Sequence, residues 1–269
     1  MPPSRRALGG RHELGQNFLV DRRVAARIAA LVPPGPVVEL GAGDGALTRQ
    51  LAARAGDVTA VELDPGRVAG LRRALGRRVR VVQADMLRFR LDADPHVVSN
   101  VPFGITTPLL RHLLGQHAWT TAVLLLQWEV ARKRAAVGGT TLLTASWWPW
   151  YEFRLAGRVP ASAFRPRPAV DGGILVLRRR PVPLVPPAER AAYQRLVREA
   201  FRGDRLLPAV RATLPAAHRW LAAHGLDRRA RPSELTAETW AALHETVHGA
   251  AEPGTGGPAP GWRERGHRR

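Results

Sequence analysis

The 269-residue sequence contains no cysteine, which excludes disulfide bonds, cysteine–zinc sites and cysteine nucleophiles together. The absence of cysteine also fits a reducing compartment, and we expect a cytoplasmic protein. No apolar run approaches the roughly 20 residues that a membrane-spanning helix needs, and the basic N-terminus is not followed by the apolar segment of a secretory signal. We therefore expect no association with a membrane.

Lysine and acidic residues are also scarce in this sequence. Lysine and arginine together number 41, but Lys133 is the only lysine, and Asp and Glu number 22, so the net charge is +19. Arginine pairs bidentately with phosphate, and a strongly basic chain displaces the counterions of a nucleic acid, so the charge predicts a nucleic-acid partner. A compositional bias toward arginine stays open as an alternative, although such a bias does not explain why acidic residues are few.

Apolar strands and amphipathic helices alternate along most of the chain. Such an alternation implies right-handed crossovers and predicts a doubly wound α/β fold with a mostly parallel sheet. The first helix of the series has Asp21 as its expected N-cap. The predicted strands are Pro36–Leu40, Val58–Val61, Val79–Val82, Val97–Ser99, Ala122–Gln127 and Ile174–Leu177, and the predicted helices are Asp21–Leu31, Leu47–Ala55, Arg67–Leu75, Thr107–Leu114 and one from about Glu129.

Changes in composition divide the chain into four parts. Residues 1–12 are rich in Pro, Gly and Arg and are expected to form a flexible arm, and residues 13–180 hold the α/β pattern. Beyond the proline-rich connector Pro181–Pro187 only helix patterns remain, which predicts a small all-helical domain over residues 181–248. Its clearest helices are Ala188–Phe201 and Ala237–Val247, the second capped by Thr236. Residues 249–269 are basic and of low complexity, and we expect a disordered tail.

Three successive predicted strands end in glycine or acidic residues. The segment Glu39–Gly45 (Glu-Leu-Gly-Ala-Gly-Asp-Gly) predicts a tight turn that lets the backbone approach a ligand at a helix N-terminus. Glu62 ends the second strand, where a carboxylate can accept hydrogen bonds from both hydroxyls of a ribose. Asp85 follows the third, where a carboxylate can accept from the exocyclic amine of an adenine. Together they predict an adenosyl ligand, and a nicotinamide or flavin dinucleotide stays open because the glycines also fit that pattern.

The segment Ser99-Asn100-Val101-Pro102-Phe103 follows the fourth strand and decides between these ligands. The amine of an adenine is a poor nucleophile, because its lone pair is delocalised into the ring. The Asn100 side-chain oxygen and a backbone carbonyl can accept hydrogen bonds from this amine and favour its tetrahedral form, while Pro102 stiffens the loop and Phe103 can stack on an extruded base. No charged base is required, because the amine loses its proton after it becomes cationic. We therefore expect Asn100, Pro102 and Phe103 to be the catalytic residues.

The chain resembles the ribosomal RNA adenine N6-methyltransferases, and within them the erythromycin-resistance (Erm) methyltransferases that modify 23S rRNA. The resemblance implies a Rossmann-like class I methyltransferase fold, macrolide resistance, a target adenine that is flipped and stacked on Phe103, and a helical domain that supports RNA binding. It also implies naked or partly assembled 23S rRNA as the partner of a monomeric enzyme. The resemblance also implies S-adenosylmethionine as the cofactor and no metal. The residues that it implies to contact this cofactor are Asn17, Leu19, Gly41, Glu62, Asp85 and Asn100. The matching segments are Leu14–Leu19, Glu39–Gly45, Glu62, Asp85, Asn100–Phe103, Phe164–Asp171 and Arg231–Leu235.

A sister branch of the same superfamily stays open. The housekeeping small-subunit rRNA dimethyltransferases share the Gln-Asn-Phe-Leu and Asn-x-Pro-aromatic segments of this chain. Three features instead resemble the resistance branch, namely Gly104 after the aromatic residue, the stretch Gly138–Thr144 and the Asp171-Gly172-Gly173 segment. Whether one or two methyl groups are added does not follow from the sequence.

Other classes of protein fit the sequence less well. A nicotinamide oxidoreductase would need a catalytic His, Tyr or Lys at the sheet's reversal point, and Lys133 is poorly placed for that role. A non-catalytic RNA-binding relative would be expected to lose one of the acidic or asparagine residues at the strand ends, and all are present. A DNA adenine methyltransferase could use a related catalytic loop. No metal site is expected, because His112 and His117 have no carboxylates near them in a ligand-like spacing.

Overall fold

The computed structural model of the protein describes residues 17–211 and 214–249, so the predicted arm (residues 1–12) lies outside the described residues, as does the predicted tail (residues 249–269) apart from Gly249, which ends the last helix. Within those ranges no helix combines the length and hydropathy that crossing a bilayer requires. The elements in chain order are β1 (Phe18–Leu19), α1 (Arg22–Ala30), β2 (Val37–Leu40), α2 (Ala46–Ala52), β3 (Val58–Glu62), α3 (Pro65–Leu75), η1 (Gly76–Arg78), β4 (Arg80–Gln83), β5 (His96–Asn100), η2 (Phe103–Ile105), α4 (Thr106–Gln116), β6 (Thr121–Gln127), α5 (Trp128–Arg134), α6 (Leu142–Trp147), β7 (Tyr151–Val159), η3 (Ala161–Ala163), β8 (Phe164–Arg165), β9 (Gly172–Arg179), η4 (Pro187–Glu189), α7 (Arg190–Ala200), α8 (Leu206–Val210), α9 (Ala217–Ala223), η5 (Pro232–Glu234) and α10 (Ala237–Gly249).

A seven-stranded sheet with the strand order β4-β3-β2-β5-β6-β9-β7 forms the centre of the fold. The pairs from β4 through β6 are parallel, and β9 is antiparallel to both of its neighbours. The chain runs outward from β2 to β4 and then returns to β5, so the direction of winding reverses between β2 and β5. Open α/β sheets bind ligands at such a reversal, beyond the carboxyl ends of the strands. The predicted doubly wound, mostly parallel sheet is confirmed.

The central strands bury side chains on both faces of the sheet. In β5, Val97 packs into a cluster with α4 and the C-terminal helices, whereas its neighbour Val98 packs into a second cluster with α1, α2 and α3. Successive residues of a strand point to opposite faces, so a strand that is covered on both faces appears in the sequence as a continuous apolar run. This is why the central strands could be predicted from their sequence.

Both predicted helix caps are present in the structure. The Asp21 carboxylate accepts from the backbone N–H of Arg23 at 2.8 Å and of Val24 at 3.2 Å, and the Thr236 hydroxyl accepts from the backbone N–H of Thr239 at 3.2 Å. These bonds satisfy amide groups that have no partner within the first turn of a helix. The helices that they begin, α1 and α10, therefore start where the sequence predicts.

Strand β7 and the small sheet of β1 with β8 are not predicted by the sequence pattern. β7 is an edge strand whose alternating residues include exposed Glu152 and Arg154, with a register irregularity between Leu155 and Gly157. A strand of this kind shows no continuous apolar run, and two-residue strands such as β1 and β8 show no period at all. The segment that follows β7 contains η3 and β8, which the sequence pattern does not predict either.

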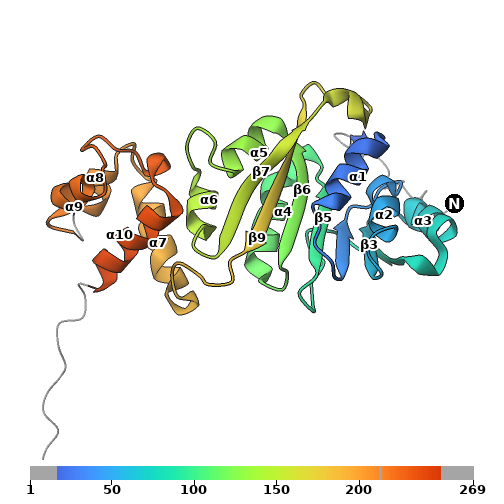
Figure 1. The fold of residues 1–269 in the computed structure, drawn as a ribbon, viewed down its shortest axis with the longest axis horizontal. Helices are drawn as coiled ribbons and strands as arrows, with labels where there is room; N and C mark the ends of the chain where they lie inside the picture. The colour runs from blue at the N-terminus through green and yellow to red at the C-terminus, as the bar shows by residue number, and fades with distance from the viewer. Residues whose placement is uncertain (1–16, 212–213, 250–269) are drawn as a thin grey trace, which may run out of the picture.

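The helices that follow β9 share a buried core with the sheet. Figure 1 shows α7 to α10, in orange and red, beyond α6 and at the opposite end of the molecule from α2 and α3. Trp150, Tyr193 and Trp240 belong to the same buried cluster as the apolar residues of α4. The Tyr193 hydroxyl donates to the Ala145 carbonyl at 2.8 Å, and Trp150 Nε1 donates to the Val185 carbonyl at 2.9 Å. That these helices form a separate domain with a boundary near residue 180 stays a prediction.

Candidate functional site

A cavity of about 770 Å³ lies at the carboxyl edge of the sheet, where β2, β3, β4 and β5 end. Ligand pockets in proteins usually enclose about 300–1,000 Å³, so the cavity has the size of a small-molecule site. In the part of the chain that the structure describes, no group of three or more His, Asp or Glu residues could hold a metal ion. The residues singled out by the sequence that line the cavity are Asn17, Leu19, Gly41, Glu62, Asp85, Asn100 and Pro102.

The glycine-rich turn after β2 forms the floor of this cavity. Gly41 has a φ of +75°, and a Cβ at this position would lie 2.2 Å from Cε of Met86, so no other residue fits without displacing that side chain. The backbone N–H groups of Gly41 and Ala42 both donate to the Val61 carbonyl, at 2.8 and 3.0 Å. These bonds hold the turn against the end of β3. The backbone can therefore approach a ligand closely, as the sequence predicts.

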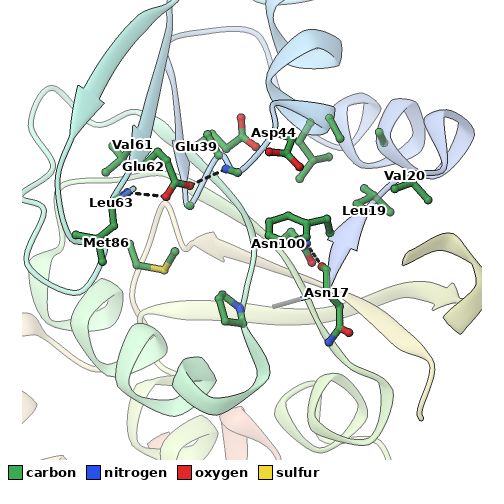
Figure 2. Close-up of a pocket in the computed structure, with 18 of the residues that line it drawn as sticks. Asn17, Leu19, Val20, Glu39, Asp44, Val61, Glu62, Leu63, Met86 and Asn100 are labelled. Carbon is green, nitrogen blue, oxygen red and sulfur yellow. Dashed lines mark hydrogen bonds between the residues drawn. The ribbon is translucent and has the colours of Figure 1, made fainter. Parts of the chain in front are cut away.

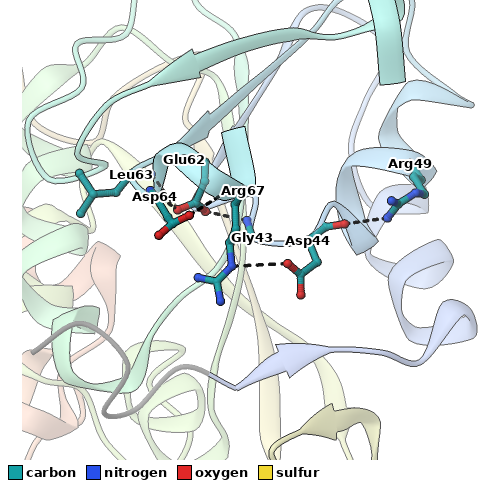
Figure 3. Close-up of polar contacts among 7 residues, drawn as sticks. All are labelled: Gly43, Asp44, Arg49, Glu62, Leu63, Asp64 and Arg67. Atoms are coloured by element: carbon teal, nitrogen blue, oxygen red, sulfur yellow. Dashed lines mark hydrogen bonds and ion pairs between the residues drawn. The ribbon is translucent and has the colours of Figure 1, made fainter. Parts of the chain in front are cut away.

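The Glu62 carboxylate ends β3 in a cradle of backbone N–H groups. Its Oε2 accepts from Gly43 at 2.7 Å, and its Oε1 accepts from Leu63 at 2.8 Å and from Asp64 at 2.9 Å. Figures 2 and 3 show this carboxylate beside the glycine-rich turn, with its side chain reaching into the cavity from β3. A carboxylate has about four lone-pair sites, so three backbone donors leave capacity for a ligand hydroxyl. The side chain is therefore both an anchor of the turn and a free acceptor.

Glu39 is a functional candidate that the sequence analysis above does not assign. It lies within β2 and is only 2% exposed, and it lines the cavity. Burial raises the pKa of Glu39 to about 8; the Thr48 hydroxyl lowers it somewhat, and the Glu62 charge raises it further. The available signal was a lone acidic residue inside the apolar run Val37–Leu40, which is unusual in a strand that is buried on both faces.

Asp85 combines a structural and a ligand-facing role at the end of β4. Its Oδ1 accepts from the backbone N–H of Leu87 at 2.9 Å, which shapes the turn after the strand. Its Oδ2 lies 3.9 Å from Nε of Arg88, an exposed and weak ion pair. Because Asp85 is only half-buried and lines the cavity, its second oxygen remains accessible to an amine donor.

The amide of Asn100 is oriented by the N-terminal segment of the described chain. Its Nδ2 donates to the Asn17 carbonyl at 2.8 Å, as Figure 2 shows, and no described residue donates to its oxygen. The neighbouring Ser99 hydroxyl donates to the Leu40 carbonyl at 2.7 Å, which ties the end of β5 to the end of β2. Among the described residues the amide oxygen of Asn100 is therefore an unused acceptor, and Asn100 lines the cavity.

The aromatic residue of the predicted catalytic loop lies just outside this edge. Phe103 begins the short turn η2 and is half-buried, and within the described residues it makes no ring contact with another aromatic side chain. Pro102 before it lines the cavity with a φ of −55°, in the range that a proline ring fixes. Phe103 therefore belongs to the loop that directly follows the end of β5, where Asn100 lies.

Strand β1 crosses the cavity and is held on both sides. Its two residues pair antiparallel with β8, which joins Phe18 to Arg165. The Arg67 guanidinium lies 4.4 Å from the centre of the Phe18 ring and 3.4 Å from the Asp44 carboxylate, and Figure 3 shows the ion pair. The contacts are partly exposed, so each contributes on the order of 1 kcal/mol or less. This arrangement brings Asn17 and Leu19 to the site although they are far from it in sequence.

The chain matches the family model "Ribosomal RNA adenine dimethylase" over residues 8–248. It belongs to this family. It is 56% identical over 265 residues to the mycinamicin-resistance protein MyrB of Micromonospora griseorubida, and this match covers 96% of this chain and 84% of that protein. It is 36% identical over 265 residues to the ribosomal RNA small subunit methyltransferase A of Moorella thermoacetica, over 88% of this chain and 92% of that one. The crystal structure of the 23S rRNA methyltransferase ErmE has a TM-score of 0.78 and 34% identity, over 86% of this chain and 100% of that chain.

The protein is thus an rRNA adenine N6-methyltransferase, and S-adenosylmethionine is the methyl donor of its family. Membership covers both the sheet and the C-terminal helices, because the matched range runs to residue 248. The nicotinamide oxidoreductase interpretation of the glycine-rich turn is therefore set aside.

Proposed function

We propose that this rRNA adenine N6-methyltransferase acts on one adenosine of 23S rRNA and so confers resistance to macrolide antibiotics. The observation that carries the transfer of a methyl group to adenosine is the Asn100 amide, whose nitrogen donates to the Asn17 carbonyl while no described residue donates to its oxygen. The choice of 23S rRNA rests on the relatives. The enzyme acts as a monomer in the cytoplasm. Its substrate is naked or partly assembled RNA, because flipping a base costs least free energy where the base is unpaired. Residues 181–248 serve as a helical domain that supports RNA binding.

The residues that line the cavity fit S-adenosylmethionine in number and kind of acceptor. Glu62 would accept from the ribose hydroxyls, and Asp85 would accept from the amine of the adenine ring. The backbone around Gly41, with its positive φ, leaves room for close approach, and Asn17 and Leu19 close the cavity from β1. When bound, this cofactor supplies an electrophilic methyl group.

Catalysis by this chain then depends on how its own residues hold the target amine. The Asn100 oxygen accepts a hydrogen bond from the amine and favours its tetrahedral form, in which the nitrogen lone pair is free to react. Pro102 fixes the path of the loop, and the Phe103 face stacks on the flipped adenine. The Asn100 amide is preorganised by its bond to the Asn17 carbonyl, so its bond to the amine strengthens as positive charge develops on the nitrogen.

The choice of the large subunit rests on the relatives more than on the sequence markers. The similarity to a mycinamicin-resistance protein, at 56% identity, exceeds the 36% identity to a small subunit methyltransferase. One of the markers has a packing role, because a Cβ at Gly173 would lie 2.7 Å from Cβ of Ala131 and 3.1 Å from the Trp128 ring. Gly173 is thus required by the contact between β9 and α5, whatever the substrate.

Removing the Glu62 carboxylate is expected to weaken cofactor binding strongly. Loss of charge-assisted hydrogen bonds of about 1.5–3 kcal/mol corresponds to a roughly 10- to 150-fold weaker affinity for S-adenosylhomocysteine in Glu62→Ala, measured by calorimetry. Asp64→Ala is the matched control, because Asp64 caps α3 through the backbone N–H of Arg67 at 2.8 Å and does not line the cavity. We expect it to lower stability by about 1 kcal/mol and to leave affinity unchanged. Equal affinities of Glu62→Ala and wild type would contradict the assignment.

Affinity for RNA is expected to depend steeply on salt. The net charge of +19 predicts the release of many counterions, so affinity for a 23S rRNA fragment should fall by about two orders of magnitude or more between about 50 and 200 mM salt. Affinity for S-adenosylhomocysteine serves as the internal control and should change by less than about twofold, because it depends on short-range contacts in the cavity. An RNA affinity that stays flat over this range would show that the arginines reflect composition alone.

Substrate competition in vitro tests the proposed function directly. Equal amounts of protein-free 23S rRNA, protein-free 16S rRNA and single-stranded DNA are offered together with labelled S-adenosylmethionine. We expect label in N6-methylated adenosine of 23S rRNA. Label in the 16S rRNA alone would favour the housekeeping function, and label in the DNA would favour a DNA methyltransferase.

A further inference from the structure

The guanidinium of Arg134, at the end of α5, lies half-buried among neutral hydroxyl groups. Its two terminal nitrogens donate to the Thr141 hydroxyl at 2.8 Å and to the Thr107 hydroxyl at 3.2 Å. Its Nε is buried without a hydrogen-bond partner, and no carboxylate of the described chain pairs with the group. Burial and the neighbouring Arg111 charge lower the pKa of Arg134. A cation that is partly removed from water without a counterion costs free energy, so packing alone does not account for an arginine here.

The Thr107 contact joins Arg134 to the Asn100–Phe103 loop. Thr107 lies in the first turn of α4, which directly follows η2 and therefore the end of this loop. Its neighbour Thr106 donates to the Phe103 carbonyl at 3.3 Å, and α4 begins without a side-chain N-cap. The entry into the loop is held by the pairing of β5 with β6. The exit from the loop therefore depends on how the first turn of α4 is held.

The Thr141 contact joins Arg134 to a segment that is itself held in place. Thr141 is the N-cap of α6 and accepts from the Thr144 N–H at 3.3 Å, and the Thr144 hydroxyl donates to the Arg134 carbonyl at 3.0 Å. The neighbouring Thr140 N–H donates to the carbonyl of Ser233 in η5 at 2.8 Å, so the segment between α5 and α6 is also bonded to the part of the chain that carries the C-terminal helices. Arg134 thus connects the start of α4 to an anchored part of the fold.

We propose that Arg134 is a positioning residue for methyl transfer, which holds the first turn of α4 through Thr107 and so fixes the path of the Asn100–Phe103 loop. The proposal rests on the proposed function, since it presumes that this loop acts on the target adenosine. Arg134 does not line the cavity, so its removal should slow the transfer step and leave the binding of the cofactor unchanged. A misplacement of about 1 Å between reacting groups can lower a rate by about 100-fold, so a modest shift of the loop is enough for a clear effect.

Single-turnover methylation of a 23S rRNA fragment, with enzyme in excess and saturating S-adenosylmethionine, measures the transfer step. We expect Arg134→Met, which keeps a long side chain and removes both donors, to lower this rate by about tenfold or more. Its affinity for S-adenosylhomocysteine should equal that of wild type. Arg132→Met is the matched control, because it removes the same charge from the same helix, whereas the Arg132 guanidinium pairs with Glu129 at 3.3 Å. We expect the control to keep the wild-type rate, and both variants to lose the same small part of the RNA affinity, because each removes one positive charge.

Substitutions of Thr107 test whether Arg134 acts through its contact with α4. Thr107→Ser keeps the accepting hydroxyl and should keep the rate, whereas Thr107→Val keeps the shape of the side chain and should lose as much as Arg134→Met. In the double variant the two losses should not multiply, because both substitutions remove the same contact. Thermal unfolding and calorimetry with S-adenosylhomocysteine establish that each variant is folded and loaded.

The outcomes separate this proposal from the proposed function. If Arg134→Met transfers the methyl group at the wild-type rate, or if its loss and that of Thr107→Val multiply, Arg134 does not position the loop. If Arg134→Met instead keeps its single-turnover rate and loses far more RNA affinity than Arg132→Met, the guanidinium contacts RNA and the proposal is overturned. If wild type transfers no methyl group to rRNA, the proposed function itself fails, and this proposal with it.

Discussion

Replacing Asn100 by alanine is expected to reduce the rate of methyl transfer to rRNA by about 10²–10³-fold, because the variant loses a preorganised acceptor that acts on charge developing in the transition state. The amide is held by the bond from its Nδ2 to the Asn17 carbonyl at 2.8 Å, so little reorganisation is needed at the moment of reaction. Single-turnover rates with saturating cofactor measure the effect. RNA affinity should change little, because the base contact is one of many between enzyme and RNA.

Phe103 provides the matched controls for this loop. Phe103→Tyr keeps the aromatic face and should retain much of the activity. Phe103→Ala should lose most of the activity, because it loses the stacking on the flipped adenine, which contributes about 1–3 kcal/mol. Calorimetry with S-adenosylhomocysteine and thermal unfolding establish that each variant is folded and loaded. A rate for Asn100→Ala near that of wild type would remove the proposed mechanism.

Expression of the protein in a macrolide-susceptible bacterium is expected to raise the inhibitory concentration of a macrolide by about tenfold or more. Methylation at N6 removes a hydrogen-bond donor and adds bulk where the drug packs, and the loss of one buried bond alone costs about 1–3 kcal/mol in drug affinity. Growth at graded drug concentrations gives the measurement. A strain that expresses Asn100→Ala at the same level should remain susceptible.

The drug classes provide an internal check on this prediction. An antibiotic that binds the small subunit should inhibit strains with and without the protein equally, because the methylated base lies in the other subunit. Unchanged susceptibility to macrolides in the presence of confirmed rRNA methylation would contradict the proposed site of action.

The central sheet could be predicted from sequence because its strands are buried on both faces. Strands such as β6 (Thr121–Gln127) appear as continuous apolar runs, and the helices between them show a clear period. The edge strand β7 could not be predicted, because its polar residues and the irregularity near Gly157 break both patterns. The pairing of β1 with β8 depends on contacts between distant parts of the chain, which no local pattern reports.

Most of the candidate site could also be predicted from the sequence, because its residues follow the strands that the sequence predicts. Glu62, Asp85 and Asn100 follow strands that are recognisable, and the ends of parallel strands meet at one edge, so their convergence follows from topology. The orientation of the Asn100 amide could not be predicted, because it depends on a hydrogen bond to the backbone carbonyl of Asn17, the residue just before β1. Glu39 was missed because its burial is a property of the packed fold, with α2 and β3 on either side.

Mass spectrometry of rRNA from cells that express the protein tests the central claim most directly. Large- and small-subunit RNAs are separated, digested and compared with RNA from cells that express Asn100→Ala. We predict N6-methylated adenosine at one position of 23S rRNA in the wild-type strain, absent from the variant strain, with 16S rRNA the same in both. New methyl groups in 16S rRNA and none in 23S rRNA would contradict the account and identify a housekeeping enzyme.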